Sequence, residues 1–145
     1  MIQIASDCDP NLLGPKQSQI QNIANKVLGS YKIQNAEISI IFGDDDLLRR
    51  LKKKFFNKNL FTDVIAFRLN DYKNEKIEGE IYISLVRAKE NATVYKEPYE
   101  KEVSRLIIHA CLHLIGFNDE TEKQKIKMMK LENKFLNNIE WSKIF

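Results

Sequence analysis

The chain has 145 residues, of which 43% are hydrophobic and 30% are charged, and its formal net charge at pH 7 is +3. This composition excludes disordered and fibrous proteins, and it leaves enough residues for one domain with a buried core. The mild positive charge permits a polyanionic partner without requiring one. The N-terminal segment MIQIASDCDPN lacks the basic flank and long apolar run of a leader, and Cys8 and Cys111 are too few for a disulfide framework. We therefore expect a cytoplasmic protein with reduced thiols and no contact with membranes.

The first third of the chain alternates strand and helix patterns. Residues 1–6 (MIQIAS) alternate weakly and predict a short edge strand, and apolar residues at helical spacing over 20–28 predict the first helix. Strict alternation returns in AEISIIFG (36–43) and predicts a second strand. Asp44, which follows it, is a residue type favoured as an N-cap and predicts the start of a helix over residues 45–57.

Two segments in the middle of the chain predict a pair of strands. TDVIAFRL (62–69) and EIYIS (80–84) are rich in β-branched and aromatic residues, and the segment between them is polar. We expect these two strands to pair antiparallel. From Ser84 the pattern becomes helical again through Ala92.

Two further helices are predicted in the last third of the chain. One runs from about Tyr99 to Ile115 and is ended by Gly116, and an amphipathic helix follows over residues 120–138. The expected inner stripe of the last helix is Ile126, Met129, Leu131 and Phe135, or their neighbours. Together these elements predict a single α+β domain over residues 1–145, in which a small mixed sheet of about four strands packs with about five helices.

The only two histidines of the chain, His109 and His113, are spaced four apart on the helix predicted to end at Gly116. This spacing places both imidazoles on one helix face, where they can bind one ion. A catalytic zinc site needs a third protein ligand and an open fourth position. Glycine can adopt the left-handed conformation that reverses the chain, so Gly116 would bring Asp119 back toward the histidines. The alternative is that the histidines are ordinary core or cleft residues with hydrogen-bonded neighbours.

The remainder of this helix is almost entirely apolar, apart from a stripe that also contains Glu102 and Arg105. A helix of this kind must be largely buried, and a buried polar stripe needs partners or a ligand. Both residues are therefore catalytic candidates. Glu102 could orient His109 or relay a proton, and Arg105 could bind a phosphate. The alternative for Glu102 is a first-turn acid that is favoured by the helix dipole.

Three segments carry a resemblance to the YbeY family of endoribonucleases. HACLHLIGFND (109–119) resembles that family's signature H-G-x-L-H-L-x-G-Y-D-H, TDVIAF (62–67) resembles T-D-V-L-S-F, and GEIYIS (79–84) resembles G-D-I-x-I. The resemblance spans residues 35–135 with order and spacing kept, and Glu102 stands where the family has an acid. It implies a zinc-dependent endoribonuclease, with zinc or another divalent ion bound by His109, His113 and Asp119. It also implies single-stranded RNA as substrate, a role in maturing the 3′ end of small-subunit ribosomal RNA, and contact with the ribosome or ribosomal proteins.

The chain departs from the family pattern at several positions. Asp119 stands in place of the third histidine, Phe117 in place of the tyrosine, and Ala110 in place of a glycine. Phe56 stands where the family has an arginine, and Lys54 or Lys58 could supply the charge nearby. Carboxylate oxygen is a competent zinc ligand, although it favours harder ions. Ala110 also lacks the carboxylate that follows the first histidine in H-E-x-x-H proteases, so peptide hydrolysis is disfavoured.

The segment RRLKKKFFNK (49–58) holds six basic residues and two phenylalanines. Such a run could follow an RNA backbone through Lys53, Lys54 and Lys58 while an exposed ring stacks on a base. The alternative is a solvated helix end favoured by the helix dipole, with Leu47, Leu48, Leu51 and Phe55 facing the core. An alternative function also stays open, namely a ribosome assembly or RNA-binding factor with a structural metal and little or no cleavage activity.

Overall fold

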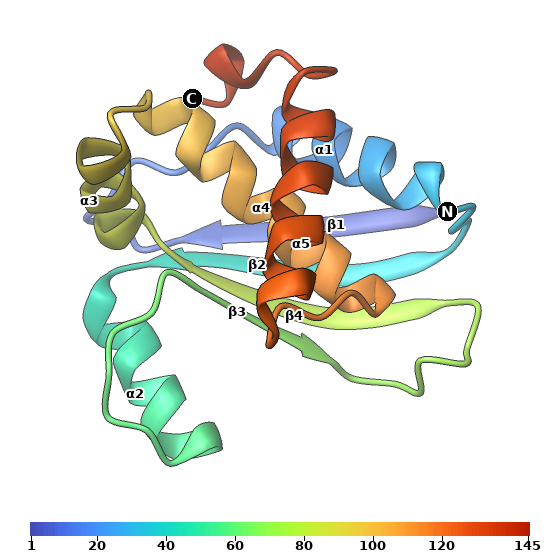
Figure 1. The fold of residues 1–145 in the computed structure, drawn as a ribbon, viewed down its shortest axis with the longest axis horizontal. Coiled ribbons are helices and arrows are strands. Elements are labelled where there is room, and N and C mark those ends of the chain that lie inside the picture. Colours follow the sequence, from blue (N-terminus) through green and yellow to red (C-terminus); the bar gives the residue numbers. More distant parts are fainter.

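The computed structural model describes residues 1–145 and contains one mixed β-sheet with the strand order β1-β2-β4-β3 (Figure 1). β1 and β2 are parallel, as are β2 and β4, and β3 pairs antiparallel with β4 at one edge. The antiparallel pairing expected for the two middle strands is confirmed. The strands are β1 (Ile2–Cys8), β2 (Ala36–Gly43), β3 (Val64–Arg68) and β4 (Ile77–Ser84).

Five α-helices pack with this sheet, which confirms the predicted α+β class. They are α1 (Gln17–Ser30), α2 (Asp45–Phe56), α3 (Leu85–Tyr95), α4 (Tyr99–Ile115) and α5 (Glu122–Leu136), and a short 3-10 helix, η1 (Trp141–Lys143), follows. In Figure 1, α1, α3, α4 and α5 lie on one side of the sheet and α2 lies on the other. None of the helices combines the length and apolar character that crossing a membrane requires.

The core lies between the sheet and α4, the helix that carries both histidines. Ile38, Ile40 and Phe42 on β2 point into this core, because alternate residues of a strand share one face. On β4, Gly79 allows α4 to approach closely, since a Cβ there would lie 2.8 Å from Leu114 Cδ1. The C-terminal half of α4 is thereby held directly over the sheet.

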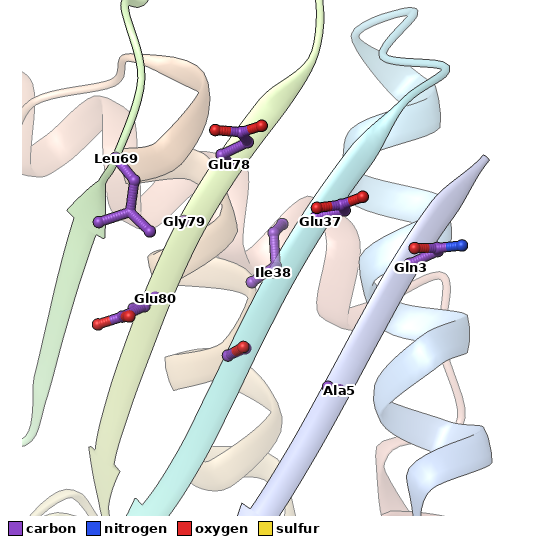
Figure 2. Close-up of a pocket in the computed structure, with 9 residues that line it drawn as sticks. Gln3, Ala5, Glu37, Ile38, Leu69, Glu78, Gly79 and Glu80 are labelled. Carbon is purple, nitrogen blue, oxygen red and sulfur yellow. The ribbon is translucent and has the colours of Figure 1, made fainter.

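The opposite face of the sheet carries carboxylates (Figure 2). Glu37, Glu78 and Glu80 line a shallow cavity of about 420 Å³ on this face. The lysine nearest to them, Lys76, lies at the rim, with its Nζ 3.1 Å from Glu37 Oε1. This face is therefore negatively charged and unfavourable for a polyanion.

The predicted inner stripe of the last helix is wrong in part. Ile126 and Met129 are 49% and 54% exposed, whereas Phe135 is buried as expected. The residues that α5 buries are Met128, Glu132, Phe135 and Leu136. Glu132 can lie on the inner face although it is polar, because Arg105 and His109 of α4 hydrogen-bond to its carboxylate. The buried face of α5 is therefore centred on other residues than the face predicted from hydrophobicity alone.

The expected core face of α2 is also only partly right. Leu48 is fully buried, but Phe55 is 57% exposed. Phe55 packs in an edge-to-face arrangement with Phe67, with 5.4 Å between ring centroids, and more than half of its surface is exposed. The last turn of α2 therefore lies outside the core.

Both cysteines are free thiols, as expected. Cys111 is completely buried on α4, and burial raises the pKa of its thiol to about 12. Such a thiol is an unreactive packing group.

Candidate metal centre

The two histidines of α4 meet at their Nε2 atoms. His109 and His113 lie one helical turn apart, and their Nε2 atoms are separated by 3.0 Å. The rings are steeply inclined to each other, at 75°, with centroids 4.5 Å apart. Two nitrogen atoms on one helix face are thus directed at the same point.

Gly116 ends α4 and brings Asp119 to this point. The glycine has φ +126°, a conformation that a side chain would strain, and its N–H donates to Leu112 O at 3.2 Å. The turn places Asp119 Oδ2 at 3.4 Å from His109 Nε2 and Asp119 Oδ1 at 3.4 Å from His113 Nε2. The structure therefore brings together the three predicted metal ligands, with one donor atom from each within 4.8 Å of the others.

The spacing of these donor atoms fits a divalent ion. Zinc binds imidazole nitrogen and carboxylate oxygen at about 2.0–2.1 Å in a tetrahedron, so neighbouring donors should lie about 3.3 Å apart. The observed separations are 3.0 Å between the two Nε2 atoms and 3.4 Å from each Nε2 to a different oxygen of Asp119, and one donor atom from each residue lies within 4.8 Å of the others. Two imidazoles and one carboxylate can hold such an ion and leave a fourth position open.

A glutamate from α5 fixes the tautomer of His109. Glu132, which is 3% exposed, places Oε2 at 2.6 Å from His109 Nδ1. A carboxylate only accepts, so Nδ1–H is the donor and Nε2 keeps its lone pair for an ion. The sequence analysis missed Glu132. The available signal was an acid four residues after Met128 and three before Phe135, in the middle of the buried face of α5.

Glu102 does not contact His109 but holds Arg105. Arg105 Nε donates to Glu102 Oε1 at 2.7 Å, and Arg105 Nη1 donates to Glu132 Oε1 at 3.0 Å. Burial alone would lower the pKa of Arg105, but its hydrogen bonds and charge pairing with the two glutamates raise it above its ordinary value. Arg105 stays charged and joins Glu102 to the residue that orients His109.

The second histidine favours its neutral form. Burial lowers the pKa of His113 below its ordinary value, and the neighbouring His109 lowers it further, whereas Asp119 acts in the opposite direction. Neutral imidazole is the metal-binding form. The lowered pKa of His113 therefore favours the form of this side chain that can bind an ion.

A family model described as endoribonuclease YbeY matches residues 11–140 of the chain. The chain belongs to the YbeY endoribonuclease family. Among its curated relatives, an endoribonuclease YbeY from Karelsulcia muelleri is 43% identical over 69% of this chain and 70% of that protein. One from Chloroherpeton thalassium is 38% identical over 83% of this chain and 84% of that protein. A solution structure from Thermotoga maritima has the same fold, with a TM-score of 0.64 at 24% identity, and the match covers 94% of this chain and 87% of that one.

In this YbeY-family chain the candidate metal centre opens into a cleft of about 680 Å³. His109, Asp119 and Arg105 line it together with Asp63, the residue before β3. Asn91 Nδ2 on α3 donates to Asp63 Oδ2 at 2.9 Å and to Glu102 Oε2 at 3.0 Å. The volume is in the range of sites for small ligands, so the cleft can admit part of a substrate.

The predicted RNA-contacting lysines lie apart from the cleft. Lys53, Lys54 and Lys58 are exposed at the end of α2 and in the loop after it. Lys52 Nζ lies 4.6 Å from the centroid of the Phe56 ring, and Lys54 Nζ lies 5.3 Å from that of the adjacent Phe55 ring. Lys52 thus adds to the positive charge that was expected near Phe56.

Proposed function

We propose that this YbeY-family chain is a zinc-dependent endoribonuclease that cleaves single-stranded RNA and matures the 3′ end of small-subunit ribosomal RNA. Membership of an endoribonuclease family supports the reaction class. The observation that carries the metal dependence is the convergence of His109, His113 and Asp119, backed by the buried Glu132. The proposed role places the protein with the ribosome, or with ribosomal proteins, in the cytoplasm.

In the proposed reaction, each residue of the centre has a distinct task. His109, His113 and Asp119 hold the ion, which when bound supplies Lewis-acid activation of water and of the phosphoryl group. Arg105 lines the same cleft and leaves 25% of its side chain exposed, so it is positioned to contact a phosphodiester oxygen. Glu102 is a positioning residue that holds this guanidinium.

The end of α2 supplies further cations for the RNA backbone. Lys53, Lys54 and Lys58 are exposed and form no ion pair with a carboxylate of the chain. Their charges are therefore free to neutralise phosphates, and we assign them to RNA contact.

The proposal is tested by replacing His113 with alanine. The variant should lose bound metal and RNA cleavage together, because two donors do not make a stable site. Metal content by plasma mass spectrometry and cleavage of a single-stranded RNA on a gel measure the two effects, with Lys143→Ala as the control. Stoichiometric metal in the variant would contradict the ligand assignment.

The alternative role as a non-cleaving assembly factor has weaker support. Structural zinc sites use four protein ligands, whereas three residues converge here. If metal-loaded wild-type protein bound RNA but left it intact, that alternative would replace the proposal.

A further inference from the structure

The last turn of α2 and the loop after it expose three aromatic rings within seven residues. Phe55, Phe56 and Phe61 are 57%, 44% and 52% exposed, respectively. Four lysines lie next to these phenylalanines in the sequence. We call the whole set the aromatic-basic patch, which consists of Phe55, Phe56, Phe61, Lys52, Lys53, Lys54 and Lys58.

The rings of Phe55 and Phe56 on α2 pack against Phe67 on β3. Phe56 stacks on Phe67 with 5.8 Å between ring centroids and an angle of 16°. Phe55 meets the same ring edge-on at 5.4 Å. Because the sheet supports them, Phe55 and Phe56 present surface to solvent without depending on a mobile loop.

The cations of the patch have no carboxylate partners. Lys54 Nζ lies 5.3 Å from the Phe55 centroid, and no lysine of the patch forms an ion pair, whereas Arg49 and Arg50 in the preceding turn both pair with Asp46. The adjoining sheet face, by contrast, is acidic (Figure 2). A patch of unpaired positive charge and exposed rings complements a flexible polyanion whose bases are free to stack.

The loop after α2 leads from the patch to the cleft of the metal centre. Phe61 lies two residues before Asp63, which lines that cleft and is bound by Asn91. The guanidinium groups of Arg87 and Arg49 lie 5.0 Å and 5.4 Å from the Phe61 centroid and add positive charge along this loop. A strand that leaves the patch along this loop would therefore reach the cleft.

We propose that the aromatic-basic patch binds single-stranded RNA by stacking a base on Phe55 while its lysines bind the neighbouring phosphates. The preference for single strands then arises at this patch and not at the metal centre, because the bases of a duplex are already stacked on one another. This inference rests on the proposed function, since it assumes that RNA is the substrate.

The test is equilibrium binding of a fluorescein-labelled single-stranded RNA in the presence of a chelator. Phe55→Ala should weaken binding about fivefold or more, the lower end of what one stacked base contributes. Phe55→Trp should restore the affinity, and RNA should quench the new indole fluorescence. Phe55→Leu should not restore it, because leucine has no ring. Leu13→Ala, at a residue that is 78% exposed on the loop after β1, is the matched control and should bind RNA normally.

Three results would overturn the proposal. These are wild-type affinity in Phe55→Ala, full rescue by Phe55→Leu, and equal loss of affinity for single-stranded and duplex RNA. Binding to anionic phosphatidylglycerol vesicles in place of RNA would also overturn it and assign the patch to a membrane surface. These binding measurements use metal-free protein and do not depend on cleavage. If the metal-loaded enzyme did not cleave RNA, the proposed function would be refuted, while the binding results would still decide whether the patch binds RNA.

Discussion

Replacing Glu132 with glutamine should weaken metal binding about 10- to 100-fold, the usual effect of removing a carboxylate that orients a ligating histidine. The carboxylate has two duties, since Oε2 lies 2.6 Å from His109 Nδ1 and Oε1 lies 3.0 Å from Arg105 Nη1. Both partners are donors, and glutamine offers one acceptor and one donor. One of the two bonds must therefore be lost, together with the negative charge. The loss corresponds to about 1.4–2.7 kcal/mol of binding free energy.

Competition with a chromophoric zinc chelator would measure this affinity, and circular dichroism would show that the variant remains folded. Glu122→Gln is the matched control, because Glu122 lies on the same helix with its side chain 87% exposed. Equal zinc affinity in wild type and Glu132→Gln would refute the assignment of Glu132 as the group that orients His109. An equal loss in both glutamine variants would point to a general charge effect.

Three further outcomes are expected. Asp119→His should raise the affinity for zinc relative to manganese, because imidazole is a softer donor than carboxylate, and an unchanged ratio in competition titrations would show that Asp119 is not a ligand. The metal-free protein should lose stability as the pH falls below 6.5, the ordinary pKa of histidine, because the unfolded chain then takes up a proton that the partly buried His113, with its lowered pKa, does not. Melting temperatures across this range measure the effect, and His113→Gln should flatten the profile. Replacing Lys53, Lys54 and Lys58 with alanine should reduce the salt slope of RNA binding by about 2, and an unchanged slope would leave these lysines as a solvated helix end.

Local sequence signals were sufficient for most of the secondary structure. The predicted bounds of α4 are the observed ones, because Pro98 precedes the helix and Gly116, at positive φ, follows it. β4 begins at Ile77, three residues before the predicted strand. The glycine at position 79 interrupts the strand pattern, and its reason is the close approach of Leu114, a contact that no local pattern reports.

The convergence of the three candidate metal ligands was predictable because the pattern that defines them is short. His109, His113 and Asp119 lie within eleven residues, and one helix and one turn fix their relation. Glu132 is 23 positions away from His109, and its role depends on how α5 packs against α4. That packing is set by side chains of two elements together, so the sequence of either helix alone gave Glu132 no more weight than any other acid.

The charges around the centre also indicate what kind of ligand it requires. Glu102, Glu132 and Asp119 contribute three carboxylates that contact Arg105 or the histidines, and Arg105 contributes one guanidinium, so these four side chains together carry a net charge of −2. Protonation of His113 does not supply the balance, because burial and the neighbouring histidine lower its pKa. Every buried side-chain polar atom has a hydrogen-bond partner. What the centre lacks is therefore positive charge and not a hydrogen bond. A divalent cation between the two Nε2 atoms and Asp119 would neutralise the net negative charge, and this accounts for a cluster of side chains with net negative charge beside an otherwise apolar, buried helix.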